Sequence, residues 1–225
     1  MTIAYNLNKI NLSLPTGVKL VVISKTRSND EIMEAYKAGQ RIFGENKVQE
    51  LLHKWESLPE DIEWHFVGHL QTNKVRSIAP FIAMVHSADS YKLLKTINDE
   101  AQRAGRVIPC LLQFHIASED SKYGFSPLYV NQEFPLFKLS DLENVTISGV
   151  MGMATFTDDQ DQIKNEFTTL NKIYHKLKKD FFSGNDDFRE ISMGMSNDYL
   201  QAIENGSTMI RIGSTIFGER YLIKS

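Results

Sequence analysis

The sequence predicts an α/β protein, a (β/α)₈ TIM barrel. Short apolar runs alternate with helix-like segments, eight such pairs follow one another, and 225 residues of 42% hydrophobic composition suffice to bury one large core. Parallel strands need long crossovers, and eight of them with intervening helices close most economically into a barrel. An open doubly wound sheet is the alternative that this pattern leaves open.

Each strand is predicted from a short apolar run that a turn or a helix signal bounds. Several runs are too short to be assigned alone, and it is their regular alternation with helices that supports them. The strand candidates are Lys19–Ser24, Arg41–Phe43, Glu63–Phe66, Met84–Ser87, Pro109–His115, Thr146–Met151, Glu190–Ser192 and Met209–Ile212.

Helix ends agree with these strand positions. Ser28 and Asp30 are cap candidates before a helix at Glu31–Lys37. A second helix, 89–104, ends at a glycine, and a third, 158–179, begins acidic and finishes basic, as the helix macrodipole favours.

Composition narrows the class of partner. The chain has 25 basic and 28 acidic residues, a net charge of −3, and neither sign forms a long block, which argues against nucleic acid and acidic membrane surfaces as partners.

Residues 1–11 lack the pattern of a signal peptide, and no segment is long and apolar enough to span a bilayer, so we expect a cytoplasmic protein. Cys110 is the only cysteine and is expected to be buried. No linker divides the chain, so residues 1–225 are predicted to form one domain.

Two Gly/Ser-rich turns near the C-terminus are suited to phosphate. One is Ser192–Ser196, after the seventh predicted strand, and the other is Gly213–Gly218, after the eighth. Phosphate commonly occupies these two loops of a TIM-type barrel, because glycine allows close backbone approach and serine donates a hydroxyl. Taken alone, the first turn is as well explained as the cap of a helix at Tyr199–Glu204. Two such loops in adjacent barrel positions favour phosphate.

Lys25 directly follows the first predicted strand, at the same edge of the barrel. A deprotonated ε-amine condenses with aldehydes, and a phosphate cradle would anchor the rest of a phosphorylated aldehyde. The predicted ligand is pyridoxal 5′-phosphate (PLP), held as a Schiff base. A lysine at a strand end is more usually just solvated, so a barrel that binds another phosphorylated metabolite without a covalent link is a further alternative.

The chain resembles the YggS/PROSC family of PLP homeostasis proteins. The matching segments run in order through nearly the whole chain and are specific together, although each is weak alone. They are Val22–Thr26, Phe43–Glu50, Trp64–Lys74, Ser192–Ser196 and Arg211–Gly218. The resemblance implies a fold similar to the N-terminal barrel of alanine racemase, with PLP bound as a Schiff base and no demonstrated racemase or transaminase activity.

The resemblance also implies a role for each matching residue. Lys25 matches the Schiff-base lysine, Asn46 a residue of the cofactor pocket, and Arg211 an arginine that faces the pyridine nitrogen. The phosphate-binding positions are matched by Ser192, Ser196, Gly213 and Ser214. Met151, near the end of the sixth predicted strand, is the best candidate among the methionines for packing on the cofactor ring, although methionine more often fills a core.

Arg211 carries the mechanistic expectation. A permanently charged guanidinium keeps the pyridine nitrogen unprotonated, which weakens the cofactor as an electron sink, so weak catalysis follows. Its plain alternative is a strand-end arginine in a surface ion pair. The plain alternative for Asn46 is the cap of a helix at Lys47–Trp55.

Two positions depart from the family pattern. His115 stands where an asparagine is usual and could add a titratable group near the cofactor, and Arg27-Ser28 replaces a common Lys-Pro. His65 and His69 lack the glutamate of a zincin motif, so we expect them at the barrel mouth or bonded to neighbouring backbone, with no metal.

The predicted function is a PLP carrier that limits free aldehyde and buffers or delivers the cofactor, with apo forms of PLP-dependent enzymes as possible recipients and a monomer as the expected state. The alternative is a PLP-dependent amino-acid racemase or related enzyme that uses Lys25 as a base. An alanine racemase needs a second base from an additional β-rich domain, for which this chain is expected to be too short.

Overall fold

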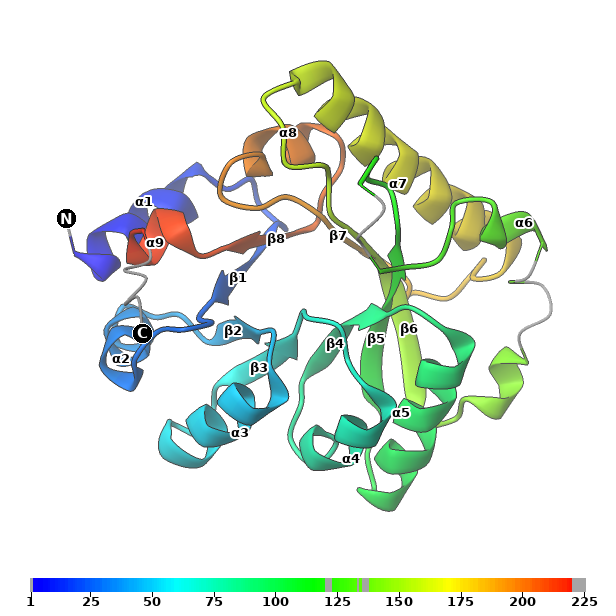
Figure 1. Ribbon diagram of the computed structural model, residues 1–225, viewed down its shortest axis with the longest axis horizontal. Helices are drawn as coiled ribbons and strands as arrows, with labels where there is room; N and C mark the ends of the chain where they lie inside the picture. Colours follow the sequence, from blue (N-terminus) through cyan, green and yellow to red (C-terminus); the bar gives the residue numbers. More distant parts are fainter. Residues whose placement is uncertain (1, 120–122, 133, 135–137, 220–225) are drawn as a thin grey trace.

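The computed structural model describes residues 2–119, 123–132, 134 and 138–219, and it is a closed barrel of eight parallel strands in sequential order, surrounded by helices (Figure 1). The strands are β1 (Lys19–Ile23), β2 (Ile42–Glu45), β3 (Glu63–Phe66), β4 (Met84–Ala88), β5 (Ile108–Phe114), β6 (Val145–Gly152), β7 (Glu190–Ser192) and β8 (Met209–Ile212). The predicted (β/α)₈ barrel is confirmed, and the open sheet is excluded because β1 pairs with both β2 and β8.

The helices lie outside the ring of strands. They are α1 (Ile3–Ser13), α2 (Asn29–Lys37), α3 (Val48–Ser57), α4 (Val75–Ile78), α5 (Tyr91–Arg103), α6 (Tyr129–Gln132), α7 (Gln160–Asp180), α8 (Tyr199–Glu204) and α9 (Ser214–Phe217), with 3₁₀ turns at Thr72–Lys74 and Leu139–Asp141. None of these described helices is long and apolar enough to cross a membrane.

The predicted helix starts are confirmed to within two residues. Of the two cap candidates for α2, Ser28 is the cap, and it forms a capping box in which the Glu31 carboxylate accepts from the Ser28 backbone N–H. Ser90 caps α5 and Asp159 caps α7.

The helix α1 was not predicted. Its buried face consists of Leu7 and Ile10, and it packs against α2 and α9, so that the first and last described helices lie side by side (Figure 1). Only two of its eleven residues are buried and three more are half-buried, which is a weak amphipathic signal, and the helix therefore depends on contacts with distant segments.

Two apolar clusters make up the core. The larger fills the space between strands and helices and includes Cys110, which is buried as expected. The smaller lies inside the barrel and consists of Val21, Met84, Leu111, Met151 and Met209. Each of these five comes from a different strand, as the layered filling of a TIM barrel requires.

Gly149 marks a bulge in β6, where Leu111 pairs with Gly149 while the preceding Cys110 pairs with Ile147. A Cβ at Gly149 would stand 1.8 Å from the Glu190 carbonyl oxygen of β7. The close approach of two strand backbones therefore requires glycine here.

We expect Gly149→Ala to lower the free energy of unfolding by about 3 kcal/mol or more, because neither backbone can move without opening the barrel. Gly39→Ala is the matched control: Gly39 has a φ of +101° but open space around a Cβ, so only the backbone cost of about 1 kcal/mol applies. Urea denaturation of both variants measures the difference, and equal losses would contradict the close-approach argument.

Candidate functional site

The cavity at the carboxyl ends of the strands has a volume of about 720 Å³, within the range of small-molecule sites. Residues that follow seven of the strands line it, among them Lys25 after β1, Asn46 after β2, Gly68 after β3 and Ser196 after β7. This is the edge at which TIM barrels assemble their sites.

The cavity floor follows from the alternation of side chains along the strands. Residues two apart on a strand point to the same face. Four residues that line the cavity each lie two positions beyond a member of the smaller apolar cluster inside the barrel. They are Ile23, Gln113, Met153 and Arg211. The floor is therefore the next inward-facing layer above the apolar filling of the barrel.

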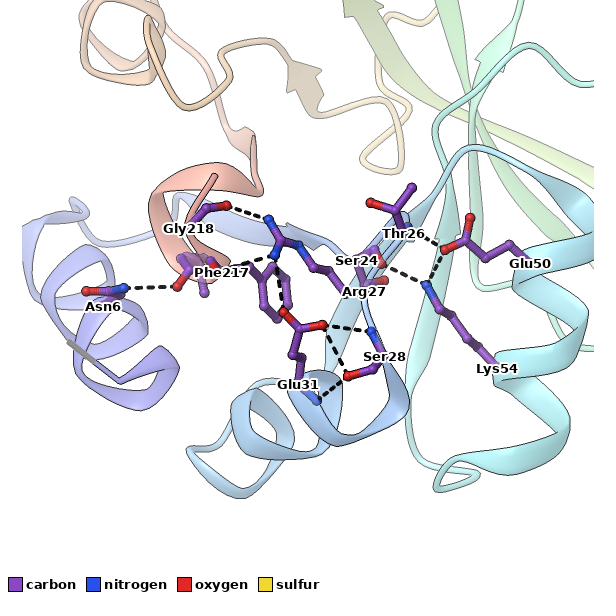
Figure 2. Close-up of polar contacts among 11 residues, drawn as sticks. Asn6, Ser24, Thr26, Arg27, Ser28, Glu31, Glu50, Lys54, Phe217 and Gly218 are labelled. Atoms are coloured by element: carbon purple, nitrogen blue, oxygen red, sulfur yellow. Dashed lines mark hydrogen bonds and ion pairs between the residues drawn. The ribbon is translucent and has the colours of Figure 1, made fainter. Parts of the chain in front are cut away.

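Lys25 is half-buried and lies in a turn. Polar contacts of its two chain neighbours, Ser24 and Thr26, hold this turn on both sides (Figure 2). Before it, the Lys54 ammonium donates to the Ser24 carbonyl at 2.7 Å. After it, Glu50 accepts from the Thr26 N–H at 2.5 Å, and Thr26 has a φ of +64°, which is uncommon for a residue with a branched side chain. The backbone around Lys25 is thus held in place by polar contacts.

Lys54 connects those contacts to a buried carboxylate. Its ammonium lies 2.7 Å from one oxygen of Glu45 and 2.7 Å from Glu50, and the Ser24 hydroxyl donates to the same Glu45 oxygen at 2.6 Å. Burial raises the pKa of Glu45, while Lys54 acts in the opposite direction. The loss of one partner would strand a buried charge, so this cluster fixes the turn strongly.

The two Gly/Ser loops lie next to each other, as predicted. The Gly213 N–H donates to the Ser196 hydroxyl at 3.4 Å, and Ser196, Gly213 and Ser214 all line the cavity. A Cβ at Gly213 would lie 3.1 Å from the Ile23 carbonyl oxygen, so the second loop packs closely on the end of β1. The lysine turn and both loops therefore border one cavity.

Asn46 lines the cavity and does not cap α3. The N-cap residue of α3 is Lys47, and no side chain bonds that end of the helix. Gly68 is needed beside Asn46, because a Cβ there would stand 2.3 Å from the Asn46 carbonyl oxygen. Glycine is therefore required here by the close approach of two backbone segments.

Arg211 is buried on the cavity floor, not in a surface ion pair. One terminal nitrogen donates to the Ser192 hydroxyl at 2.6 Å and the other to the Gly152 carbonyl at 3.0 Å. Ser192 is fully buried and does not line the cavity, so its predicted contact with phosphate is not supported. The inward direction of its side chain places it behind Arg211.

A chain of hydrogen bonds continues from Ser192 through two buried histidines. His86 Nδ1 lies 3.1 Å from the Ser192 hydroxyl, and His86 Nε2 lies 2.9 Å from His65 Nδ1. A guanidinium only donates, so the hydroxyl accepts from Arg211. When the hydroxyl donates to His86 Nδ1, neutral His86 carries its proton on Nε2 and donates to His65, and the other tautomer reverses both bonds.

Burial determines the charges of the side chains in this hydrogen-bonded series. It lowers the pKa of His65 to about 3, with Lys19 contributing, and that of His86 well below its usual value, with His65 and Arg211 contributing. Burial also lowers the pKa of Arg211 to about 10, against the influence of Asp198. At neutral pH the guanidinium is therefore the charged member of a chain whose histidines are neutral.

Three other residues lie differently from expectation. Met151 belongs to the interior cluster and does not line the cavity, whereas Met153, one inward-facing position further along, does. His115 bonds the Glu119 carbonyl at 2.7 Å and does not line the cavity either. His69 lies at the mouth, as expected, with Asp89 at 3.0 Å, while His65 is in the interior.

Sequence reasoning missed the Glu45–Lys54 cluster and the role of His86. Glu45 stands out only as an acidic residue at the end of a short apolar strand, and nothing local indicates that Lys54, nine positions later, reaches it. Among the residues that the structure describes, no group of three or more His, Cys, Asp or Glu side chains is arranged to hold a metal ion.

The comparisons with known proteins agree on one family. The model of the alanine racemase N-terminal domain matches residues 1–221. Proteins named pyridoxal phosphate homeostasis protein are similar over most of their length. The protein of Vibrio alginolyticus is 39% identical, and the match covers 92% of this chain and 88% of that protein. The protein of Homo sapiens is also 39% identical, and the match covers 90% of this chain and 76% of that protein.

Solved structures agree with this result. PipY of Synechococcus elongatus, solved with PLP bound, is 34% identical, with a TM-score of 0.85 over 96% of this chain and 100% of that one. An alanine racemase of Clostridium difficile shares the fold at 14% identity, with a TM-score of 0.74, and is covered over 57% of its chain.

The buried histidines predict how stability depends on pH. Both are neutral in the fold, but in the unfolded chain they take up protons below a pH of about 6.5. As the pH falls from 6.5 towards 3, the unfolded state binds more protons than the native state, so stability falls. Between pH 7 and pH 5 we expect a loss of about 2 kcal/mol for each histidine.

Urea denaturation at both pH values, for the original chain and for His65→Gln/His86→Gln, measures this loss. The double variant is expected to have the flatter profile. Parallel profiles for the two proteins would overturn the assignment of neutral histidines.

Proposed function

The chain belongs to the alanine racemase N-terminal domain family and is similar over most of its length to pyridoxal phosphate homeostasis proteins, and from this premise we propose that it binds PLP and serves vitamin B6 homeostasis. One observation carries the proposal: a single cavity gathers Lys25, Arg211 and both Gly/Ser loops at the carboxyl ends of the strands. These are the groups that a phosphorylated pyridine aldehyde needs.

The residues present fit this cofactor. Lys25 is the amine that would hold the aldehyde as a Schiff base. Ser196, Ser214 and the Gly213 backbone supply donors for phosphate, and Arg211 supplies N–H groups for the pyridine nitrogen. When bound, PLP supplies a reactive aldehyde and an electron sink.

We propose that the protein is a carrier rather than an enzyme. The Arg211 guanidinium can donate hydrogen bonds but cannot accept them, so it favours an unprotonated pyridine nitrogen. A pyridine ring without that proton withdraws electrons weakly. The chain's own residues therefore support holding the cofactor more than catalysis. The full proposal is one PLP-binding domain, residues 1–225, that acts as a cytoplasmic monomer and limits, buffers or delivers PLP, with apo-enzymes as recipients.

Lys25→Ala tests the covalent link. Purified protein is mixed with PLP, reduced with borohydride, and mapped by peptide mass spectrometry and absorbance. We expect a reduced adduct on Lys25 that Lys25→Ala loses and Lys47→Ala keeps, since Lys47 is an exposed lysine next to the cavity residue Asn46. An adduct spread over surface lysines would overturn the proposal.

Exchange of the α-hydrogen of L- and D-alanine for deuterium, followed by NMR on the PLP-loaded protein, separates carrier from racemase. We expect no exchange above that of free PLP. Enzymatic turnover that Lys25→Ala abolishes would overturn the carrier assignment in favour of the racemase.

Ser192→Ala tests whether the hydroxyl behind Arg211 supports cofactor binding. It removes an acceptor from a buried guanidinium, so we expect about a tenfold loss of PLP affinity, the scale of one charge-assisted hydrogen bond. Ser87→Ala is the matched control, because Ser87 is equally buried and its hydroxyl has no hydrogen-bond partner. Equal affinities of the two variants for PLP, by absorbance titration, would contradict this role.

A further inference from the structure

Side chains from the N-terminal part of the chain hold the C-terminal end of helix α9 (Figure 2). The final carbonyls of a helix have no partner within it. At the end of α9, the Asn6 amide from α1 donates to the Ile216 carbonyl at 3.0 Å. The Arg27 guanidinium donates to the next two carbonyls, at 3.4 Å to Phe217 and in a short contact to Gly218.

Arg27 is well placed for this task. Its side chain is only 10% exposed, it lies 5.3 Å from the centre of the Phe217 ring, and Glu31 accepts from it at 3.2 Å. Arg27 does not line the cavity, so it acts through other residues.

Arg27 belongs to two turns at once. Its backbone N–H donates to the Ser24 carbonyl at 3.0 Å, which closes the turn that contains Lys25. Its side chain holds the end of α9, a helix of only one turn whose other end is Gly213-Ser214. The Gly218 N–H bonds the Ser214 carbonyl at 2.8 Å, so fixing one end of α9 fixes the other.

The geometry points to Arg27 as the positioning residue that sets the phosphate loop relative to Lys25, and thereby the preference for phosphorylated over unphosphorylated pyridoxal. This inference rests on the proposed function of the cavity. The planar guanidinium serves two carbonyls and a carboxylate together, which the single ammonium of a lysine at this position does with poorer geometry.

The test compares PLP with pyridoxal in absorbance titrations of Arg27→Lys and the original chain. We expect PLP affinity to fall about tenfold, the equivalent of one charge-assisted hydrogen bond, and pyridoxal affinity to change less than about twofold. Pyridoxal closes partly to a hemiacetal in solution, but this property of the free ligand cancels in the ratio between variant and original.

Two further variants complete the design. Asn6→Ala removes the contact to Ile216 from the far side of α9, so it should lower PLP affinity selectively, by a smaller factor, even if Arg27→Lys does not fold. Arg106→Lys is the control, because the Arg106 guanidinium also donates to a carbonyl at the end of a helix, that of Ala79 after α4. Arg106 directly precedes β5, so it lies at the opposite edge of the barrel from the cavity. It should leave both affinities unchanged.

Equal losses for PLP and pyridoxal in Arg27→Lys, or no loss of either, would overturn the inference. So would an Asn6→Ala variant with unchanged PLP affinity. The proposed function fails separately, if the original chain itself forms no adduct with PLP on Lys25.

Discussion

The closure of the barrel between β1 and β8 is the constraint on which the site depends. Val22 pairs with Ile212 across this seam, so the turn after β1 and the loop after β8 begin at the same height. Gly213 then packs on the Ile23 carbonyl, which brings the second Gly/Ser loop against the start of the turn that contains Lys25. The packing of α1 against α9 reinforces the seam from outside. An open sheet of the same strands would leave Lys25 and Ser214 at opposite edges.

A second constraint comes from the alternation of inward-facing residues. Apolar side chains fill the middle of the barrel, and the layer above them is partly polar, with Arg211 and His86 each bonded to the Ser192 hydroxyl. A buried guanidinium is stable only if acceptors surround it. Ser192 and the Gly152 carbonyl supply them from below, so the orientation of Arg211 is determined inside the barrel and is independent of any ligand.

The fold was predictable because each β-α unit carries its own signal in apolar runs and helix caps. The site was predictable where a residue follows a strand end, as do Lys25, Asn46 and Gly213, because the barrel brings all strand ends together. Two kinds of feature were not. Ser192 lies within β7, and its side chain is fully buried, whereas Ser196 follows the strand and lines the cavity. The motif that contains both serines does not encode this difference in burial. The partners of Glu45 and Arg27 come from separate elements, and no periodicity relates such pairs.

The distribution of charge supports the carrier over the catalyst. Of the acidic groups near Lys25, Glu45 and Glu50 share the Lys54 ammonium, and they lie beneath and beside the turn. On the cavity floor the fixed charge is the Arg211 guanidinium, whose histidine partners stay neutral because they are buried. The acidic residues that line the cavity are Asp158 and Asp198, and Asp198 accepts from the Met195 N–H. A cavity with a cationic floor and hydroxyl donors at one side favours an anionic phosphate ester and an unprotonated pyridine together. Under the proposed function, such a site would hold PLP in the form that stabilises carbanions least, so tight binding and weak catalysis would follow from the same residues.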